Sequence, residues 1–95
     1  MKSKMIKFMI DNKYLAKNSL IHATINAPGL GGFPVQVDKD LLFDEYAQSS
    51  KGAIYVKGCD PENLQHYVIG ASKIHELNGM DEETILRLYP EYKSV

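Results

Sequence analysis

The sequence is divided into short apolar segments bounded by turn-forming residues, and this division limits the folds that the chain can adopt. Ile21, Ala23 and Ile25, for example, occupy alternate positions with polar residues between them. An alternation of period two is typical of a strand with one buried face, whereas an amphipathic helix needs apolar residues three and four positions apart. The pattern therefore predicts a mainly β domain.

Six segments have this extended pattern or a β-branched composition. The predicted strands cover residues 6–10, 19–26, 35–37, 53–56, 64–69 and 72–77. Residues 41–46 fit either a strand or a helical turn, and both alternatives stay open. The turn chemistry of residues 58–63 predicts a hairpin between the strands on either side of it, and we expect the first two strands to pair with each other.

The pattern changes after the Asn78-Gly79 turn. Asp81 can cap a helix, with acidic residues after it near the positive end of the helix dipole, and Pro90 ends the helix. We therefore expect an α+β, mainly β fold over residues 1–95. We expect a single domain that contains a small antiparallel barrel or strongly curved sheet of five to six strands, SH3-like or OB-like. One short C-terminal helix follows the sheet.

The composition argues against several classes of protein. With 95 residues, 44% hydrophobic content and a net charge of −1, the chain can form one core but has little room for a deep enclosed active site. Its single cysteine, Cys59, cannot form an intrachain disulfide. No apolar run approaches the length of a membrane span, and none resembles a signal peptide. We expect a cytoplasmic protein without membrane association.

Residues 27–34 form a glycine-rich loop that also carries Leu30 and Phe33. A phosphate-binding loop needs Lys and Ser or Thr after its last glycine, followed by a helix, whereas here Phe33 and Pro34 follow. Two arrangements remain. Either the two apolar side chains fold back over the mouth of a barrel, or they project into solvent as an anchor pair for another protein.

Four carboxylates follow the loop closely. They are Asp38, Asp40, Asp44 and Glu45. The spacing fails as a calcium loop, because Leu42 and Phe43 stand where that loop needs Asp or Asn and then Gly. A solvated acidic edge of this kind can still steer a basic partner toward the loop, so we assign these four residues to the same partner-binding site as Leu30 and Phe33.

An alternative hypothesis is weak binding of RNA or single-stranded DNA. Five lysines and one aspartate lie within residues 1–17, and tyrosines could provide platforms for stacking bases. The residues assigned to this alternative are Lys2, Lys4, Lys7, Lys13, Lys17, Tyr55 and Tyr67. The near-zero net charge of the whole chain argues against a dedicated nucleic-acid binder.

Catalytic and metal-binding motifs are weak. The spacing of Cys59 and the three histidines does not match a structural zinc site. A Cys59–His66 nucleophile pair across the predicted hairpin is the least favoured alternative. We therefore expect no enzyme, no metal and no cofactor. The leading hypothesis is a protein-binding module, an accessory or inhibitor protein of a bacterium, phage or mobile element, and a homodimer is also compatible with the sequence.

Overall fold

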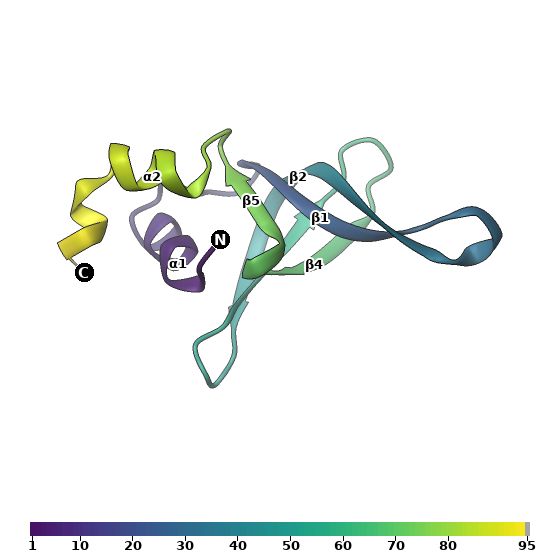
Figure 1. Cartoon of the computed structure of the whole chain (residues 1–95), viewed down its shortest axis with the longest axis horizontal. Coiled ribbons are helices and arrows are strands. Elements are labelled where there is room, and N and C mark those ends of the chain that lie inside the picture. The colour runs from purple at the N-terminus through teal and green to yellow at the C-terminus, as the bar shows by residue number, and fades with distance from the viewer. Residues whose placement is uncertain (95) are drawn as a thin grey trace.

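The computed structural model describes residues 1–94 and shows an α+β fold built on one five-stranded antiparallel sheet (Figure 1). Its strands are β1 (Leu20–Pro28), β2 (Pro34–Gln48), β3 (Ile54–Cys59), β4 (His66–Gly70) and β5 (Ile74–Leu77). Their order across the sheet is β4-β3-β2-β1-β5. Val95, the last residue of the expected domain, lies outside the described residues.

Two α-helices accompany the sheet, α1 (Ser3–Asp11) and α2 (Glu82–Leu88). Three short 3-10 segments complete the fold: η1 (Leu30–Gly32), η2 (Ala71–Lys73) and η3 (Pro90–Ser94). The predicted C-terminal helix is confirmed, and the Asp81 carboxylate caps it by accepting a hydrogen bond from the Thr84 amide at 2.8 Å. No helix among residues 1–94 is long and apolar enough to cross a bilayer.

The N-terminal segment is a helix, and the strand predicted at residues 6–10 is wrong. Met5, Ile6 and Met9 are all buried, a spacing that forms one face of a helix. The alternation of Ile6, Phe8 and Ile10 concealed this face, because a short apolar run can satisfy both periods. The segment consequently does not pair with residues 19–26, and the chain has two α-helices instead of the expected one.

The ambiguous residues 41–46 belong to β2, a single 15-residue strand that also contains the segment predicted at 35–37. The first part of β2 pairs with β1 and its last part with β3. A register shift between Phe43 and Glu45 marks a bulge, which allows the strand to bend between its two partners. The predicted hairpin across residues 58–63 is confirmed as β3 and β4, with Cys59 opposite His66.

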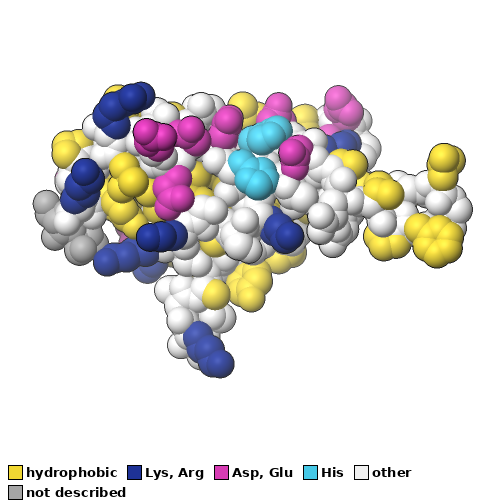
Figure 2. All heavy atoms as spheres, in the orientation of Figure 1, with side chains coloured by type: hydrophobic (Ala, Val, Ile, Leu, Met, Phe, Trp, Pro, Cys, Tyr) yellow, Lys and Arg dark blue, Asp and Glu magenta, His cyan; other side chains and the backbone are white. Residues whose placement is uncertain are grey.

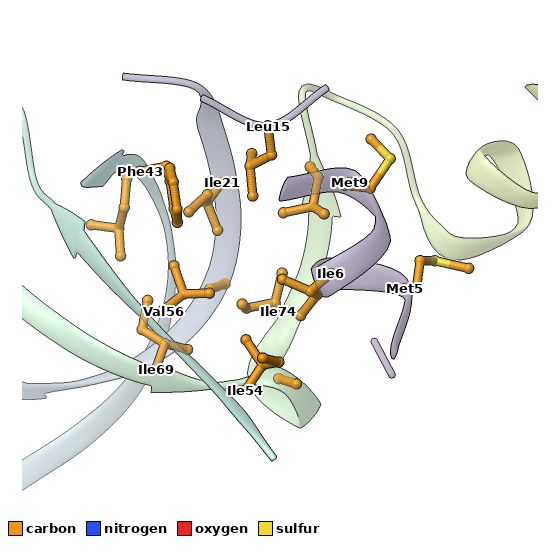
Figure 3. Close-up of a cluster of buried hydrophobic side chains, with 14 of the residues drawn as sticks. Met5, Ile6, Met9, Leu15, Ile21, Phe43, Ile54, Val56, Ile69 and Ile74 are labelled. Carbon is orange, nitrogen blue, oxygen red and sulfur yellow. The ribbon is translucent and has the colours of Figure 1, made fainter. Parts of the chain in front are cut away.

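One hydrophobic core lies between α1 and the sheet. In Figure 3, Ile6 of α1 points toward Ile54 and Ile74, while Met9 lies near Leu15. The other buried side chains of the sheet face the same core, among them Ile21, Ala23, Ile25, Leu41, Phe43, Val56, Ile69 and Leu77. The two edge strands, β4 and β5, do not pair with each other, so the sheet is open and does not close into a barrel.

Candidate protein-binding site

The hairpin between β1 and β2 extends beyond the core as an arm, which we define as residues 26–36 (Figure 1). Ile25 and Val37 form the last cross-strand pair with a buried member, and in Figure 1 no helix of residues 1–94 lies over the pairs beyond it. The arm accounts for the elongated shape of the molecule, which measures 49 × 28 × 21 Å. It therefore presents its end to solvent at a distance from the core.

The end of the arm is ordered by its backbone. Strand pairing continues to Pro28 and Pro34, and the Gly29 amide then donates to the Phe33 carbonyl at 2.8 Å. Gly31 and Gly32 have φ values of 72° and 79°, which other residues rarely adopt. A Cβ on Gly29 would lie 2.7 Å from the Phe33 carbonyl oxygen. The glycines thus permit a close turn of defined shape.

Leu30 and Phe33 both lie at this end and point into solvent. Their exposed fractions are 99% and 75%, and Val35 behind them is 44% exposed. Figure 2 shows hydrophobic side chains gathered at the far end of the arm. The two side chains therefore project into solvent and do not fold back over the body.

Two of the four predicted acidic residues belong to a polar cluster on the outer face of the sheet (Figure 2). The Asp40 carboxylate lies 2.8 Å from Nδ1 of His22 on β1. The Asp38 carboxylate accepts a hydrogen bond from the Thr24 hydroxyl at 2.5 Å, and the same hydroxyl lies 2.7 Å from Nε2 of His75 on β5. These contacts join β2, β1 and β5 across their solvent-facing side.

The other two acidic residues lie elsewhere. Asp44 is 3.7 Å from Nζ of Lys17, in the segment before β1, and Glu45 is 3.6 Å from Nζ of Lys57 on β3. The structure therefore does not bring the four carboxylates together. Only Asp38 and Asp40 lie on the part of β2 that leads into the arm, and even Asp38 is separated from Phe33 by five positions along the chain.

An ion pair between a buried carboxylate and a partly exposed lysine, near the base of the arm, was not predicted from the sequence. Asp60, in the turn after β3, is 2% exposed, and its carboxylate accepts a hydrogen bond from Lys39 Nζ at 2.7 Å. This bond, together with one from the Glu62 amide, lowers the pKa of Asp60 against the opposing effect of burial. The same bond to Asp60 raises the pKa of Lys39. The pair ties the middle of β2 to the β3–β4 turn.

The residues assigned to nucleic-acid binding are dispersed. Lys7 bonds to Asp11 at 2.8 Å within α1, and Lys17 has Asp44 as a neighbour. Tyr55 lies on the outer face of β3 and is 44% exposed, whereas Tyr67 is half-buried against the core. The five lysines lie immediately before α1, on it and in the loop after it, not on an exposed strand face as the predicted N-terminal strand implied.

The Cys59 side chain shows no contact that would activate it. Cys59 and His66 are cross-strand neighbours, but the hydrogen bond made by the thiol goes to the backbone carbonyl of Asp60 at 3.7 Å. Within residues 1–94, no three His, Cys, Asp or Glu side chains are grouped so that they could hold a metal ion.

The site that emerges is an ordered apolar tip on a projecting arm, with a polar cluster near its base. Sequence reasoning named Leu30, Phe33, Asp38 and Asp40 as candidates but missed the polar cluster. The reason is that His22, Thr24 and His75 come together only through strand pairing. The sole signal was the outward position of His22 and Thr24 on a predicted strand. No protein-family model matches the chain, and no curated protein or solved structure matches it.

Proposed function

We propose that this protein binds another protein through the tip of its arm, with Leu30 and Phe33 as the anchor residues. The observation that carries the proposal is the exposure of these two side chains, 99% and 75%, on a hairpin that projects away from the core. Scattered exposed apolar residues are common on protein surfaces. Two on one protruding turn, with Val35 behind them, form a compact patch of the kind that marks a contact surface.

The energetics of such a tip suit an anchor. Burial of two large apolar side chains in a partner contributes roughly 1.5–3 kcal/mol each before the costs of association. Those costs fall when the binding conformation is already formed. The hydrogen bond from Gly29 to Phe33 and the restricted backbone of Gly31 and Gly32 give the tip one conformation before it meets a partner.

Asp38 and Asp40 are proposed to contribute to the rate of encounter more than to the final contact. Both carboxylates are exposed at the base of the arm and already bond to Thr24 and His22. Exposed charges of this kind attract an oppositely charged surface over about a Debye length. A partner with a basic rim around an apolar pocket would match this arrangement.

The test is a capture experiment with a matched control. The chain is immobilised and exposed to a nuclease-treated lysate of the organism that encodes it, and retained proteins are identified by mass spectrometry. A Leu30→Ser/Phe33→Ser variant should lose the retained protein. A Leu64→Ser/Leu88→Ser variant removes two exposed apolar side chains outside the arm, and it should retain that protein as the wild type does.

A photoreactive phenylalanine analogue at position 33 gives a second readout. It should form a covalent adduct with the retained protein under ultraviolet light, while the same analogue at position 88 on α2 should not. Equal capture by the arm variant and the wild type would overturn the proposal. Capture that occurs only from a parallel lysate without nuclease treatment would also overturn it and would favour the nucleic-acid alternative.

For the fold, we propose the SH3-like alternative of the two barrel architectures. The support is the strand order, since β1 to β4 follow one another as neighbours and β5 returns to β1. An OB-fold is a Greek-key arrangement and lacks this simple sequence of neighbours. In addition, the single turn η2 joins the two edge strands, which requires strong curvature of the sheet. Backbone distances between β4 and β5 in an experimental structure would test this assignment.

A further inference from the structure

The edge of the sheet formed by β4 is unprotected. β4 pairs with β3 along one side, and no strand among residues 1–94 pairs with the other side. Exposed edges are usually blunted by charged residues, proline or a covering segment. β4 reads His-Tyr-Val-Ile-Gly and contains no Asp, Glu, Lys, Arg or Pro.

By contrast, the opposite edge of the sheet, formed by β5, is covered. The N-terminal ammonium group of Met1 donates to the Ile74 carbonyl at 3.0 Å and to the Ala71 carbonyl at 3.1 Å. At the other end of β5, the amide and carbonyl of Leu77 both bond to Met80 at 2.9 Å. The side chains of β5 also include a charge, Glu76. The fold thus covers one edge of its sheet and leaves the other open.

We propose that β4 is a dimerisation edge at which two copies of this chain pair antiparallel, giving one sheet continuous across both copies. Unpaired backbone N–H and C=O groups along an edge are matched by another extended backbone. A second copy supplies one, because a two-fold axis through Val68 places Val68 beside its own equivalent, Tyr67 beside Ile69 and His66 beside Gly70. This isologous pairing satisfies both edges at once.

Side chains on both faces suit a second copy. Because β4 has no Asp, Glu, Lys or Arg, no like charges oppose each other across the axis, and the net charge of −1 per chain adds little repulsion. Val68 is 74% exposed, so the pairing buries a large part of an apolar side chain in each copy.

The core-facing side of the edge also has space. A cavity of about 180 Å³ lies beside β4, lined by Tyr67 and Ile69 of β4 and by Ile25 and Gln36 at the base of the arm. Residues of β1 line the other side of this cavity, so part of the β4 edge faces a hollow and not packed side chains. This site is separate from the arm tip, so the dimer and the proposed partner can bind the same chain independently.

The experiment measures the mass of the native chain by sedimentation equilibrium from micromolar to millimolar concentration. The wild type should approach twice the chain mass of 10.7 kDa. Val68→Lys should weaken dimerisation about tenfold or more, because it places two like charges at the axis. Leu88→Lys makes the same charge change on α2 and should dimerise as the wild type does. Circular dichroism establishes that each variant is folded.

Hydrogen exchange assigns the interface. Raising the wild-type concentration should slow amide exchange in residues 66–70 and leave residues 74–77 unchanged. Three results would overturn the proposal: a chain that stays monomeric at millimolar concentration, a dimer that folded Val68→Lys leaves intact, or a dimer lost in Leu30→Ser/Phe33→Ser, which would place the contact at the arm. None of these results depends on whether the arm captures another protein.

Discussion

The β1–β2 hairpin contains the same two apolar residue types in opposite environments. Leu41 and Phe43 in the body are 0% and 5% exposed, while Leu30 and Phe33 at the tip of the arm are 99% and 75% exposed. The two sets lie about ten positions apart. Side-chain chemistry therefore does not decide which residues form the core. What decides it is whether a helix or a neighbouring strand lies over that part of the hairpin.

This difference in burial gives the two parts of the hairpin different roles. In the body, Leu41 packs over Gly58 of β3, where an added Cβ would lie 3.1 Å from the Cβ of Leu41. In the arm, the backbone is as well paired as in the body, but no second layer covers the side chains. Burial in the body stabilises the fold, and exposure in the arm leaves apolar surface available for a partner.

The largest effect is expected for Leu41→Ala. Truncation of a fully buried leucine removes its transfer free energy and leaves a cavity, which together cost about 2–5 kcal/mol. For a domain of this size we expect the Tm to fall by about 15 °C. Thermal unfolding followed by circular dichroism measures the change. A fall of less than about 4 °C would contradict the placement of Leu41 in the core.

A smaller effect is expected at the base of the arm, for Asp60→Asn. The substitution removes the buried carboxylate of the pair with Lys39, and the Tm should fall by about 5–10 °C at neutral pH. The structure predicts that this site anchors the middle of β2 to the β3–β4 turn. Lys39→Met removes the other charge of the pair and should also lower the Tm.

The same pair gives a pH dependence with a definite sign. Because the Lys39 bond lowers the pKa of Asp60 in the folded state, the stabilisation is present above about pH 4 and is lost as the pH falls through the lowered pKa. The raised pKa of Lys39 means that its contribution is present below about pH 10 and is lost above that. Between pH 5 and 2, the Tm of the wild type should fall more steeply than that of Asp60→Asn.

A fall in Tm smaller than that of Asp60→Asn is expected for Gly29→Ala, a substitution within the arm. The new Cβ would lie 2.7 Å from the Phe33 carbonyl oxygen and 2.8 Å from a methyl group of Val35, so the tip must shift. Because the shift is confined to the arm, we expect the Tm to fall by only about 3–5 °C. Amide chemical shifts should change in residues 27–35 and stay constant in the body. Unchanged shifts in the tip would show that it does not hold the described conformation.

The smallest effect is expected for Leu30→Ala, the same chemical change as at Leu41. A fully exposed side chain loses no burial on truncation, so the Tm should stay within about 2 °C of the wild type. A large fall would break the comparison between the two regions, since it would mean that Leu30 packs against the body. The Leu30→Ser/Phe33→Ser variant should likewise stay folded while it loses the partner.

The sequence allowed much of the sheet to be predicted, because alternation and turn residues act over a few positions. It identified the strand with Ile21, Ala23 and Ile25, the hairpin across residues 58–63 and the helix that Asp81 caps. It failed at Ile6 and Phe8, where a short run fits both a strand and a helix. This segment folds as a helix because Met5, Ile6 and Met9 can then cover the core side of the sheet together.

For the site, the sequence by itself determined which residues could act: a glycine turn that carries Leu30 and Phe33, followed by Asp38 and Asp40. Only the tertiary structure decided that the turn projects and that the carboxylates divide between the arm base and the body. The physical reason is that backbone preferences are local, whereas exposure and charge pairing depend on which distant segments lie alongside. No segment of the described chain covers the arm, and that absence of a second layer makes its apolar residues a surface.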